Sequence, residues 1–286
     1  AARAMLEPLM FGGYMSGGQL MLTSGIENFP GYPEGIGGPE MMVQLREQAE
    51  RFGLTVEDKN VERVDFSERP FKIYVEGEEF LAKSVIISTG AEAIWLGAEG
   101  EEAQKGRGIS VCATCDGAFF RNEEVMVIGG GDSAMEEATF LTRFADKVTI
   151  INRRDVFRAS KVMYDRANAN PKIEIIPHRQ VTRWLSDEKG LTGAILEDPR
   201  DGSETEITVT GAFIAIGHKP ITAFLDDQID TDEEGYILHS EHTMTNVPGV
   251  FAAGDVVDTR YRQAVTAAGM GCQAAMDAEK WLEEHN

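Results

Sequence analysis

What the sequence has little of excludes several classes of protein. Three cysteines among 286 residues are too few for a disulfide scaffold and favour a reducing compartment, the cytoplasm. No stretch approaches the roughly 18 apolar residues of a membrane-spanning helix. Lysine and arginine number 27 against 48 aspartates and glutamates, and the net charge of -21 disfavours binding to nucleic acid or to an anionic membrane.

Two of the three cysteines form one motif, Cys112-Ala-Thr-Cys115, followed at once by Asp116 and Gly117. Such a pair can open and close a disulfide, with one thiol attacking and the other resolving. Half of a zinc site is the alternative, although neither Cys272 nor the five histidines supply a second pair at ligand spacing. Cys272 itself is predicted to be a buried structural thiol in a helix. Asp116 is either a turn former or the acid/base that moves the proton of the dithiol.

A glycine-rich motif follows the cysteine pair. Residues 123–128 predict a strand, the sequence Gly-Gly-Gly-Asp-Ser-Ala occupies 129–134, and residues 135–143 are compatible with a helix. This matches G-x-G-x-x-G/A, in which the glycines allow a tight turn and close approach of a pyrophosphate, and the last small residue allows helix–strand packing. The helix N-terminal amides would face the phosphates. With the cysteine pair nearby, the motif predicts electron transfer between a nicotinamide and a disulfide.

Arginines follow the next predicted strand, residues 147–151, at the point where an NAD site usually places an acid. Asn152 comes first, then Arg153 and Arg154, and Arg158 lies four residues further on. Arginines suit a ribose 2′-phosphate, so the sequence favours NADPH over NADH. The neighbouring acid, Asp155, weakens this preference for NADPH. The alternative interpretation is that the arginines form a solvated basic loop.

The length predicts about two domains. Two apolar runs, 85–90 and 213–217, each end in glycine and bracket the cysteine pair and the glycine-rich motif. We interpret them as the two crossings between a discontinuous outer domain and an inserted one, in an α/β fold with two Rossmann-like domains. The predicted domains are residues 1–91 with 218–286, and residues 92–217. Residues 60–81 and 173–210 are predicted to form short β meanders.

Segments of the outer domain suggest a second ligand. Residues 249–255 predict a strand ending in Gly-Asp, and Tyr-Arg-Gln-Ala at 261–264 leads a helix over 265–281. A Gly-Asp end before a helix N-terminus suits the ribityl or phosphate part of a second dinucleotide. Gly-Gly-Gln-Leu at 17–20 and Glu-Asn-Phe-Pro-Gly at 27–31 are further candidates, and each segment alone could be an ordinary loop.

Taken together, these motifs resemble those of the low-molecular-weight thioredoxin reductases of the bacterial and plant type, and their order and spacing cover essentially the whole chain. The motifs are those at 17–20, 27–31, 112–117, 129–134, 153–155, 253–255 and 261–264.

The resemblance implies a homodimeric flavoprotein of the pyridine nucleotide-disulfide oxidoreductase fold, with no metal. NADPH would reduce FAD, FAD would reduce the Cys112–Cys115 disulfide, and the dithiol would reduce thioredoxin. Cys115 would face the flavin, Cys112 would attack thioredoxin, Asp116 would be the acid/base, and the inserted NADPH domain would rotate against the FAD domain. The implied FAD contacts are Gly17, Gly18, Gln19, Leu20, Asn28, Val61, Asp255, Arg262, Gln263 and Ala264. The implied NADPH contacts are Gly130, Gly131, Asp132, Ser133, Arg153, Arg154 and Arg158.

Two features depart from this family. The family begins with a strand and a glycine turn for FAD, and residues 1–4 of this chain match the end of the helix that follows that turn. We therefore expect an N-terminally truncated chain that binds FAD poorly. Asn152 stands where the family often has histidine. The alternative functions are a related flavin-dependent disulfide reductase or dithiol oxidase with another partner, and an NADPH-binding fragment that transfers no electrons.

Overall fold

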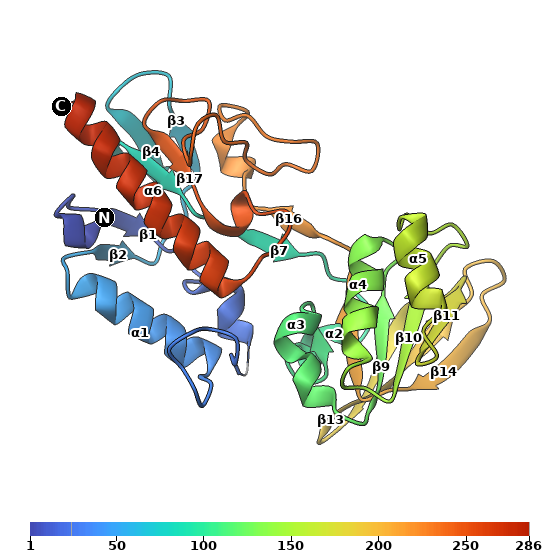
Figure 1. The fold of residues 1–286 in the computed structure, drawn as a ribbon. Helices are drawn as coiled ribbons and strands as arrows, with labels where there is room; N and C mark the ends of the chain where they lie inside the picture. The colour runs from blue at the N-terminus through green and yellow to red at the C-terminus, as the bar shows by residue number, and fades with distance from the viewer. Residues whose placement is uncertain (24, 286) are drawn as a thin grey trace. The chain divides into compact units, whose positions relative to one another are not determined.

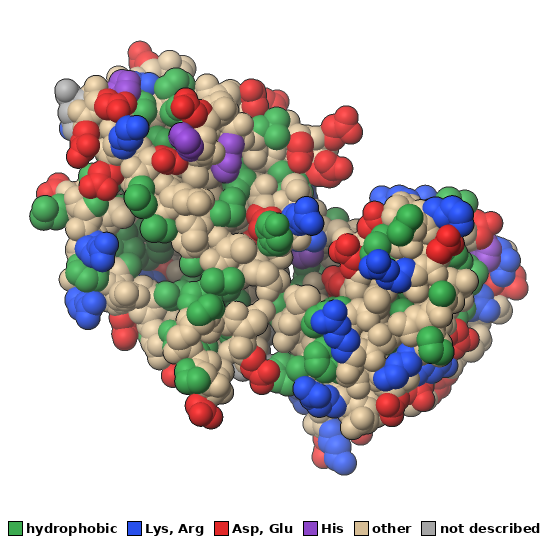
Figure 2. All heavy atoms as spheres, viewed as in Figure 1, with side chains coloured by type: hydrophobic (Ala, Val, Ile, Leu, Met, Phe, Trp, Pro, Cys, Tyr) green, Lys and Arg blue, Asp and Glu red, His purple; other side chains and the backbone are tan. Residues whose placement is uncertain are grey.

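The computed structural model describes residues 1–23 and 25–285, and the chain divides into two compact units. The discontinuous unit comprises residues 1–92 and 219–286, and the inserted unit comprises residues 93–218 (Figure 1). Among the described residues, no helix combines the length and the apolar character needed to cross a membrane. Acidic side chains are visible on both units, and lysine and arginine are frequent on the face of the inserted unit shown in Figure 2.

The inserted unit is built on a five-stranded parallel sheet in the order β11-β10-β9-β15-β8. Taken in chain order from β9, four of these strands follow the Rossmann order 3-2-1-4. In sheets of this order, ligands bind at the carboxyl ends of the strands where the order reverses, which here are β9 and β15. These strands span Ile173–Pro177 (β11), Lys147–Asn152 (β10), Glu124–Ile128 (β9), Gly211–Ile214 (β15) and Ile109–Ser110 (β8).

Both faces of this sheet are covered, as a parallel sheet requires. On one face, α4 (Asp132–Leu141) and α5 (Lys161–Asn168) pack over residues such as Val127 and Phe213. On the other face lies an antiparallel sheet, β12-β13-β14, whose Trp184 packs in one cluster with Met126. These strands span Gln180–Asp187 (β12), Gly190–Glu197 (β13) and Glu204–Thr208 (β14), and α2 (Glu101–Gln104), α3 (Ala113–Asp116) and η3 (Gly117–Phe120) complete the unit.

The discontinuous unit joins short sheets to two longer helices, α1 (Gly38–Glu50) and α6 (Ala264–His285). Its strands form the parallel pairs β1-β2 and β6-β17 and the antiparallel sheet β3-β4-β5. Phe71, Ile73 and Val250 lie in the core between these sheets, and Trp281 of α6 packs with Phe251. The strands are Leu9–Phe11 (β1), Thr55–Glu57 (β2), Arg63–Asp65 (β3), Phe71–Val75 (β4), Glu78–Ala82 (β5), Val85–Ile87 (β6) and Val250–Ala252 (β17), and the 3₁₀ helices are Ala2–Ala4 (η1), Gly18–Leu22 (η2), Ala223–Leu225 (η4) and Gly254–Val256 (η5).

The chain crosses between the units one strand later than the sequence indicated. The crossings are β7 (Ala91–Ala93) and β16 (His218–Pro220), which pair with each other. The apolar runs at 85–90 and 213–217 were misassigned because β6 and β15 are internal strands of their own units, where Ile87 and Phe213 are buried. The predicted meander over 173–210 is likewise shorter, because residues 173–177 join the parallel sheet beside β10.

Candidate functional site

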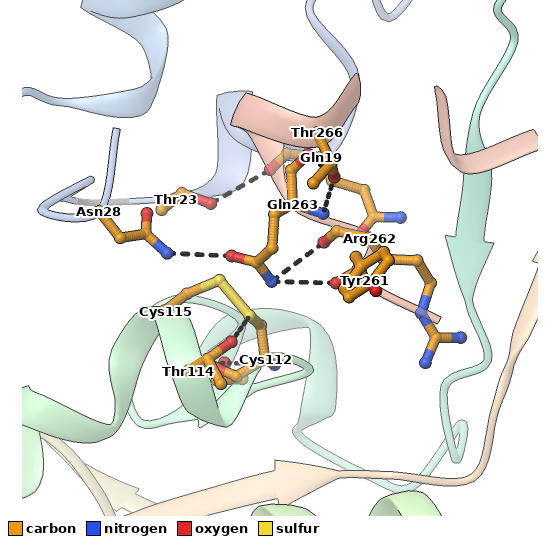
Figure 3. The surroundings of a disulfide bond; sticks show 11 residues. Gln19, Thr23, Asn28, Cys112, Thr114, Cys115, Tyr261, Arg262, Gln263 and Thr266 are labelled. Atoms are coloured by element: carbon orange, nitrogen blue, oxygen red, sulfur yellow. Dashed lines mark hydrogen bonds between the residues drawn. A yellow bond between two sulfur atoms is a disulfide. The ribbon is translucent and has the colours of Figure 1, made fainter. Parts of the chain in front are cut away.

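Cys112 and Cys115 are joined by a disulfide in the segment that follows β8, the edge strand of the inserted unit. Cys112 precedes α3, and its carbonyl oxygen accepts hydrogen bonds from the N–H groups of Cys115 (3.2 Å) and Asp116 (3.1 Å). Both cysteines are half-buried, and Cys112 Sγ lies 3.4 Å from Thr114 Oγ1 (Figure 3). The pair is therefore built into one tight helical turn, and both cysteines are partly exposed.

Packing fixes this turn against α4. Ala113 is buried, and a Cβ atom added at Gly117 would come within 3.0 Å of the Leu141 side chain. Glycine at 117 therefore allows close contact with the helix that follows the glycine-rich turn. The redox segment and the predicted nucleotide-binding segment consequently belong to one packed unit.

Asp116 has an environment suited to holding a proton. Its carboxyl is half-buried, and burial raises its pKa above the ordinary value, while a hydrogen bond from the Ser110 hydroxyl opposes the rise. Ser110 is buried, and its Oγ also accepts the Cys112 N–H at 3.0 Å. Sequence reasoning missed Ser110, because only the fold reveals that its hydroxyl bridges the first cysteine and the carboxyl.

The glycine-rich turn fits the cradle of a dinucleotide. Gly129 has a φ of +153°, and a Cβ there would lie 2.3 Å from the Ala215 carbonyl oxygen and 3.0 Å from the Ala134 Cβ. A Cβ on Gly130 would meet the Asn152 side chain at 2.8 Å, whereas one on Gly131 would meet open space. The turn at the start of α4 therefore leaves room above Gly131, and the amides of Asp132 and the next residue, Ser133, are among the first-turn donors that a helix leaves unpaired.

The three arginines after β10 are exposed. Among the described residues, none of the side chains of Arg153, Arg154 and Arg158 forms an ion pair. The neighbouring basic residues differ, because Arg179 and Arg200 both pair with the buried Asp198, at 2.5 Å and 2.7 Å. The exposed arginines thus keep their guanidinium donors for a phosphate, and the donor chemistry fits the 2′-phosphate of NADPH.

In the discontinuous unit, Asp255 carries a buried oxygen that lacks a partner. Its Oδ1 accepts no hydrogen bond from any described residue. Burial and the nearby Asp258 raise the pKa of Asp255, and Arg262 opposes the rise. A buried acceptor of this kind needs a donor, and the ribityl hydroxyls of FAD are such donors. The residues present therefore fit a flavin at the end of β17.

Asp258 organises the loop that leads into α6. Its Oδ1 accepts the N–H groups of Arg260 (2.9 Å) and Tyr261 (2.8 Å), and its Oδ2 accepts that of Arg262 (2.9 Å). These bonds lower its pKa although burial raises it, and Arg262 adopts a left-handed φ of 47°. Sequence reasoning missed Asp258. The tendency of aspartate to accept amides two and three residues ahead is the signal that could have found it.

The structure brings together other predicted flavin contacts. Asn28 Nδ2 donates to Gln263 Oε1 at 2.9 Å, and Gln263 Nε2 in turn donates to the carbonyls of Tyr261 and Arg262 (Figure 3). Gln263 directly precedes Ala264, the first residue of α6. Residues far apart in sequence thus meet at this helix start.

The remaining predicted flavin residues lie at two places. Gly17 and Gly18 adopt left-handed φ values of 99° and 59° at the start of η2, which includes Gln19 and Leu20. Gln19 Nε2 donates to the Ala91 carbonyl. Val61, by contrast, packs its side chain against the core of the discontinuous unit. The predicted buried role of Cys272 is wrong, because its position on α6 is exposed to solvent.

Comparison with known proteins defines the class. The family model described as pyridine nucleotide-disulphide oxidoreductase matches residues 1–271, and the chain belongs to this family. It is 52% identical to a thioredoxin reductase from Mycolicibacterium smegmatis, over 100% of this chain and 92% of that one. It is also 52% identical to thioredoxin reductase 2 from Arabidopsis thaliana, over 99% and 78%.

Among solved structures, the thioredoxin reductase from Giardia duodenalis matches with a TM-score of 0.93 and 42% identity, over 99% of this chain and 93% of that one. The resemblance to low-molecular-weight thioredoxin reductases and the predicted α/β fold class are therefore confirmed.

Proposed function

We propose that this protein is a thioredoxin-disulfide reductase that passes electrons from NADPH, by way of FAD and the Cys112–Cys115 disulfide, to oxidised thioredoxin. The observation that carries the proposal is a half-buried disulfide built into the same unit as a Rossmann-type glycine turn. Overall, NADPH and one proton convert the thioredoxin disulfide into two thiols and leave NADP⁺. The bound flavin supplies the two-electron relay between the nicotinamide and the disulfide.

Thiol exchange accounts for the role of each cysteine. Once the pair is reduced, the Cys112 thiolate attacks one sulfur of the thioredoxin disulfide, forms a mixed disulfide and releases a thioredoxin thiolate. The Cys115 thiolate then attacks the Cys112 sulfur, which restores the Cys112–Cys115 disulfide and releases the second thiolate. Two protons complete the thioredoxin thiols. Asp116 would hold one of these protons, because burial raises its pKa above the ordinary value and so favours the protonated carboxyl.

We assign the two cofactors to the two units. The discontinuous unit would hold FAD through Asp255, whose Oδ1 has no hydrogen-bond partner among the described residues, and through the loop of Arg262 and Gln263. The inserted unit would hold NADPH through the open turn at Gly131 and the exposed arginines. The further flavin contacts proposed are Gly17, Gly18, Gln19, Leu20, Asn28, Val61 and Ala264, and the further NADPH contacts are Gly130, Asp132 and Ser133.

We further propose that the protein is a cytoplasmic homodimer. We assign the protein to the cytoplasm, since a chain with one working disulfide and only one other cysteine suits a reducing compartment. We also propose a homodimer, on the strength of its resemblance to thioredoxin reductases.

The test is NADPH oxidation, followed at 340 nm, by the protein supplied with FAD and oxidised thioredoxin. Cys112→Ser and Cys115→Ser should each abolish turnover, because neither variant can form the disulfide. Cys272→Ser is the matched control, since this exposed cysteine lies outside the pair, and it should keep full activity. Turnover retained by both pair variants would refute the proposal. Turnover with another disulfide substrate but not with thioredoxin would identify a different partner.

A further inference from the structure

The arginine loop after β10 is bonded directly to the glycine-rich turn. The Gly130 carbonyl oxygen accepts the N–H groups of Arg158 (2.7 Å) and Ala159 (3.0 Å). Asp132 Oδ1 accepts the N–H of Ser160 at 2.6 Å. Three bonds therefore tie the end of the loop to the segment that begins α4, although 28 residues separate Asp132 from Ser160.

Asn152 fixes the start of the same loop. Its Nδ2 donates to the carbonyls of Arg154 (2.8 Å) and Val156 (3.3 Å). Its side chain also fills the space that a Cβ on Gly130 would need. The amide of Asn152 therefore closes the loop on itself while it packs against the glycine turn.

These bonds have a consequence for exposed arginines. An exposed arginine loses side-chain entropy when it binds a phosphate, and a mobile backbone would add a further cost. Anchoring the loop at both ends removes that added cost. The anchoring also holds the arginines that would bind a 2′-phosphate at a fixed distance from the glycine turn that would bind the pyrophosphate. The loop and the turn therefore act as one template that spans both phosphates.

We propose that Asn152 and Asp132 are positioning residues that set the preference for NADPH over NADH by holding the loop of Arg153, Arg154 and Arg158 against the glycine turn. This inference rests on the proposed NADPH site. The NADPH contact proposed for Asp132 uses its main-chain N–H at the start of α4. A carboxylate has only acceptor atoms and cannot donate to a phosphate, so the side chain acts through its bond to Ser160. Asn152 acts in the same way, through the backbone of the loop.

The experiment measures the dissociation constants of NADPH and NADH by isothermal titration calorimetry on the full chain, without added flavin. Asn152→Ala should lower the preference for NADPH roughly fivefold, the size expected for one or two ordinary hydrogen bonds. Asp132→Ala should do the same. Asp132→Asn keeps an acceptor oxygen for Ser160 and should retain the preference. Asn168→Ala, an exposed asparagine in the same unit, is the matched control and should change nothing.

A double-mutant cycle separates positioning from an independent effect. Without the side chains of Arg153 and Arg158, Asn152→Ala should lower the preference by much less than in the native background, because the residue acts through those arginines. Equal losses of NADPH and NADH affinity in Asn152→Ala and Asp132→Ala, with far-ultraviolet circular dichroism unchanged, would overturn the inference and leave the NADPH site intact. Failure of the unmodified chain to bind NADPH would overturn the proposed site and the inference together.

Discussion

Removing the Asp258 carboxylate should disorder the loop that precedes α6. In the native protein this single side chain accepts three backbone N–H groups, and the residue is only 8% exposed. Asp258→Ala leaves all three donors without their acceptor. Asp258→Asn keeps an acceptor oxygen for the N–H groups of Arg260 and Tyr261. Its side-chain amide would, however, place a donor N–H opposite the N–H of Arg262. The expected order of loop stability is therefore aspartate, then asparagine, then alanine.

The magnitude follows from the exposure of the donors. A hydrogen bond to a charged group contributes about 1.5–3 kcal/mol, so three independent bonds would contribute about 4.5–9 kcal/mol. The three bonds share one carboxylate, however, and Tyr261 is 61% exposed, so water can replace part of the lost hydrogen bonding. We therefore expect a cost of about 2 kcal/mol for Asp258→Ala. This corresponds to roughly 30-fold weaker FAD binding if the loop must be ordered to bind.

Two measurements test this expectation. Hydrogen exchange followed by mass spectrometry should show faster exchange over residues 258–264 in Asp258→Ala, whether or not FAD is present. Flavin titration followed by fluorescence should give the weaker affinity. Asp230→Ala, at an exposed aspartate of the same unit whose side chain forms no hydrogen bond among the described residues, is the control. Unchanged exchange in this loop, or FAD affinity within twofold of the native value, would refute the reasoning.

The remaining predictions concern the inserted unit. Asp116→Asn should slow thioredoxin reduction. In the native protein, stopped-flow measurements should show the rate falling as pH rises through the raised pKa of Asp116, and this limb of the pH–rate profile should be absent in the variant. Ser110→Ala should raise the pKa of Asp116 further, because the lost hydrogen bond lowers it, and should move that limb to higher pH in the same assay. Arg153→Ala with Arg158→Ala should weaken NADPH at least tenfold more than NADH by calorimetry, about the value of one charge-assisted hydrogen bond, and equal losses would exclude a 2′-phosphate contact. Asp198 has a strongly lowered pKa, so its contribution to stability should be complete above the ordinary pKa of about 4 and be lost as pH falls below it; Asp198→Asn should therefore lower the urea midpoint at neutral pH much more than at about pH 2.

Much of the fold and of the candidate site could be predicted from local sequence patterns. The strand, glycine turn and helix over 123–143 were predictable because the residues that the turn requires for steric reasons, Gly129, Gly130 and Ala134, lie within one short segment of the sequence. The disulfide pair was likewise predictable, because Cys112 and Cys115 lie in one short motif. The crossings at β7 and β16 were missed because these three-residue strands have little apolar character, whereas β6 and β15 beside them lie in apolar runs.

The positioning roles that escaped prediction share one physical property, which is that they depend on bonds to the backbone. Ser110, Asp258 and Asn152 each hold main-chain N–H or carbonyl groups, and main-chain groups are identical at every position of the sequence. A residue pattern can mark such a partner where it lies a few residues away, as in the Asp258 loop. Elsewhere the path of the chain selects the partner. The arginines and cysteines that perform the proposed chemistry are visible in the sequence because their side chains are chemically distinctive. The residues that place them become visible only when the backbone is known, and these are the positions where conservative substitutions separate a structural role from a chemical one.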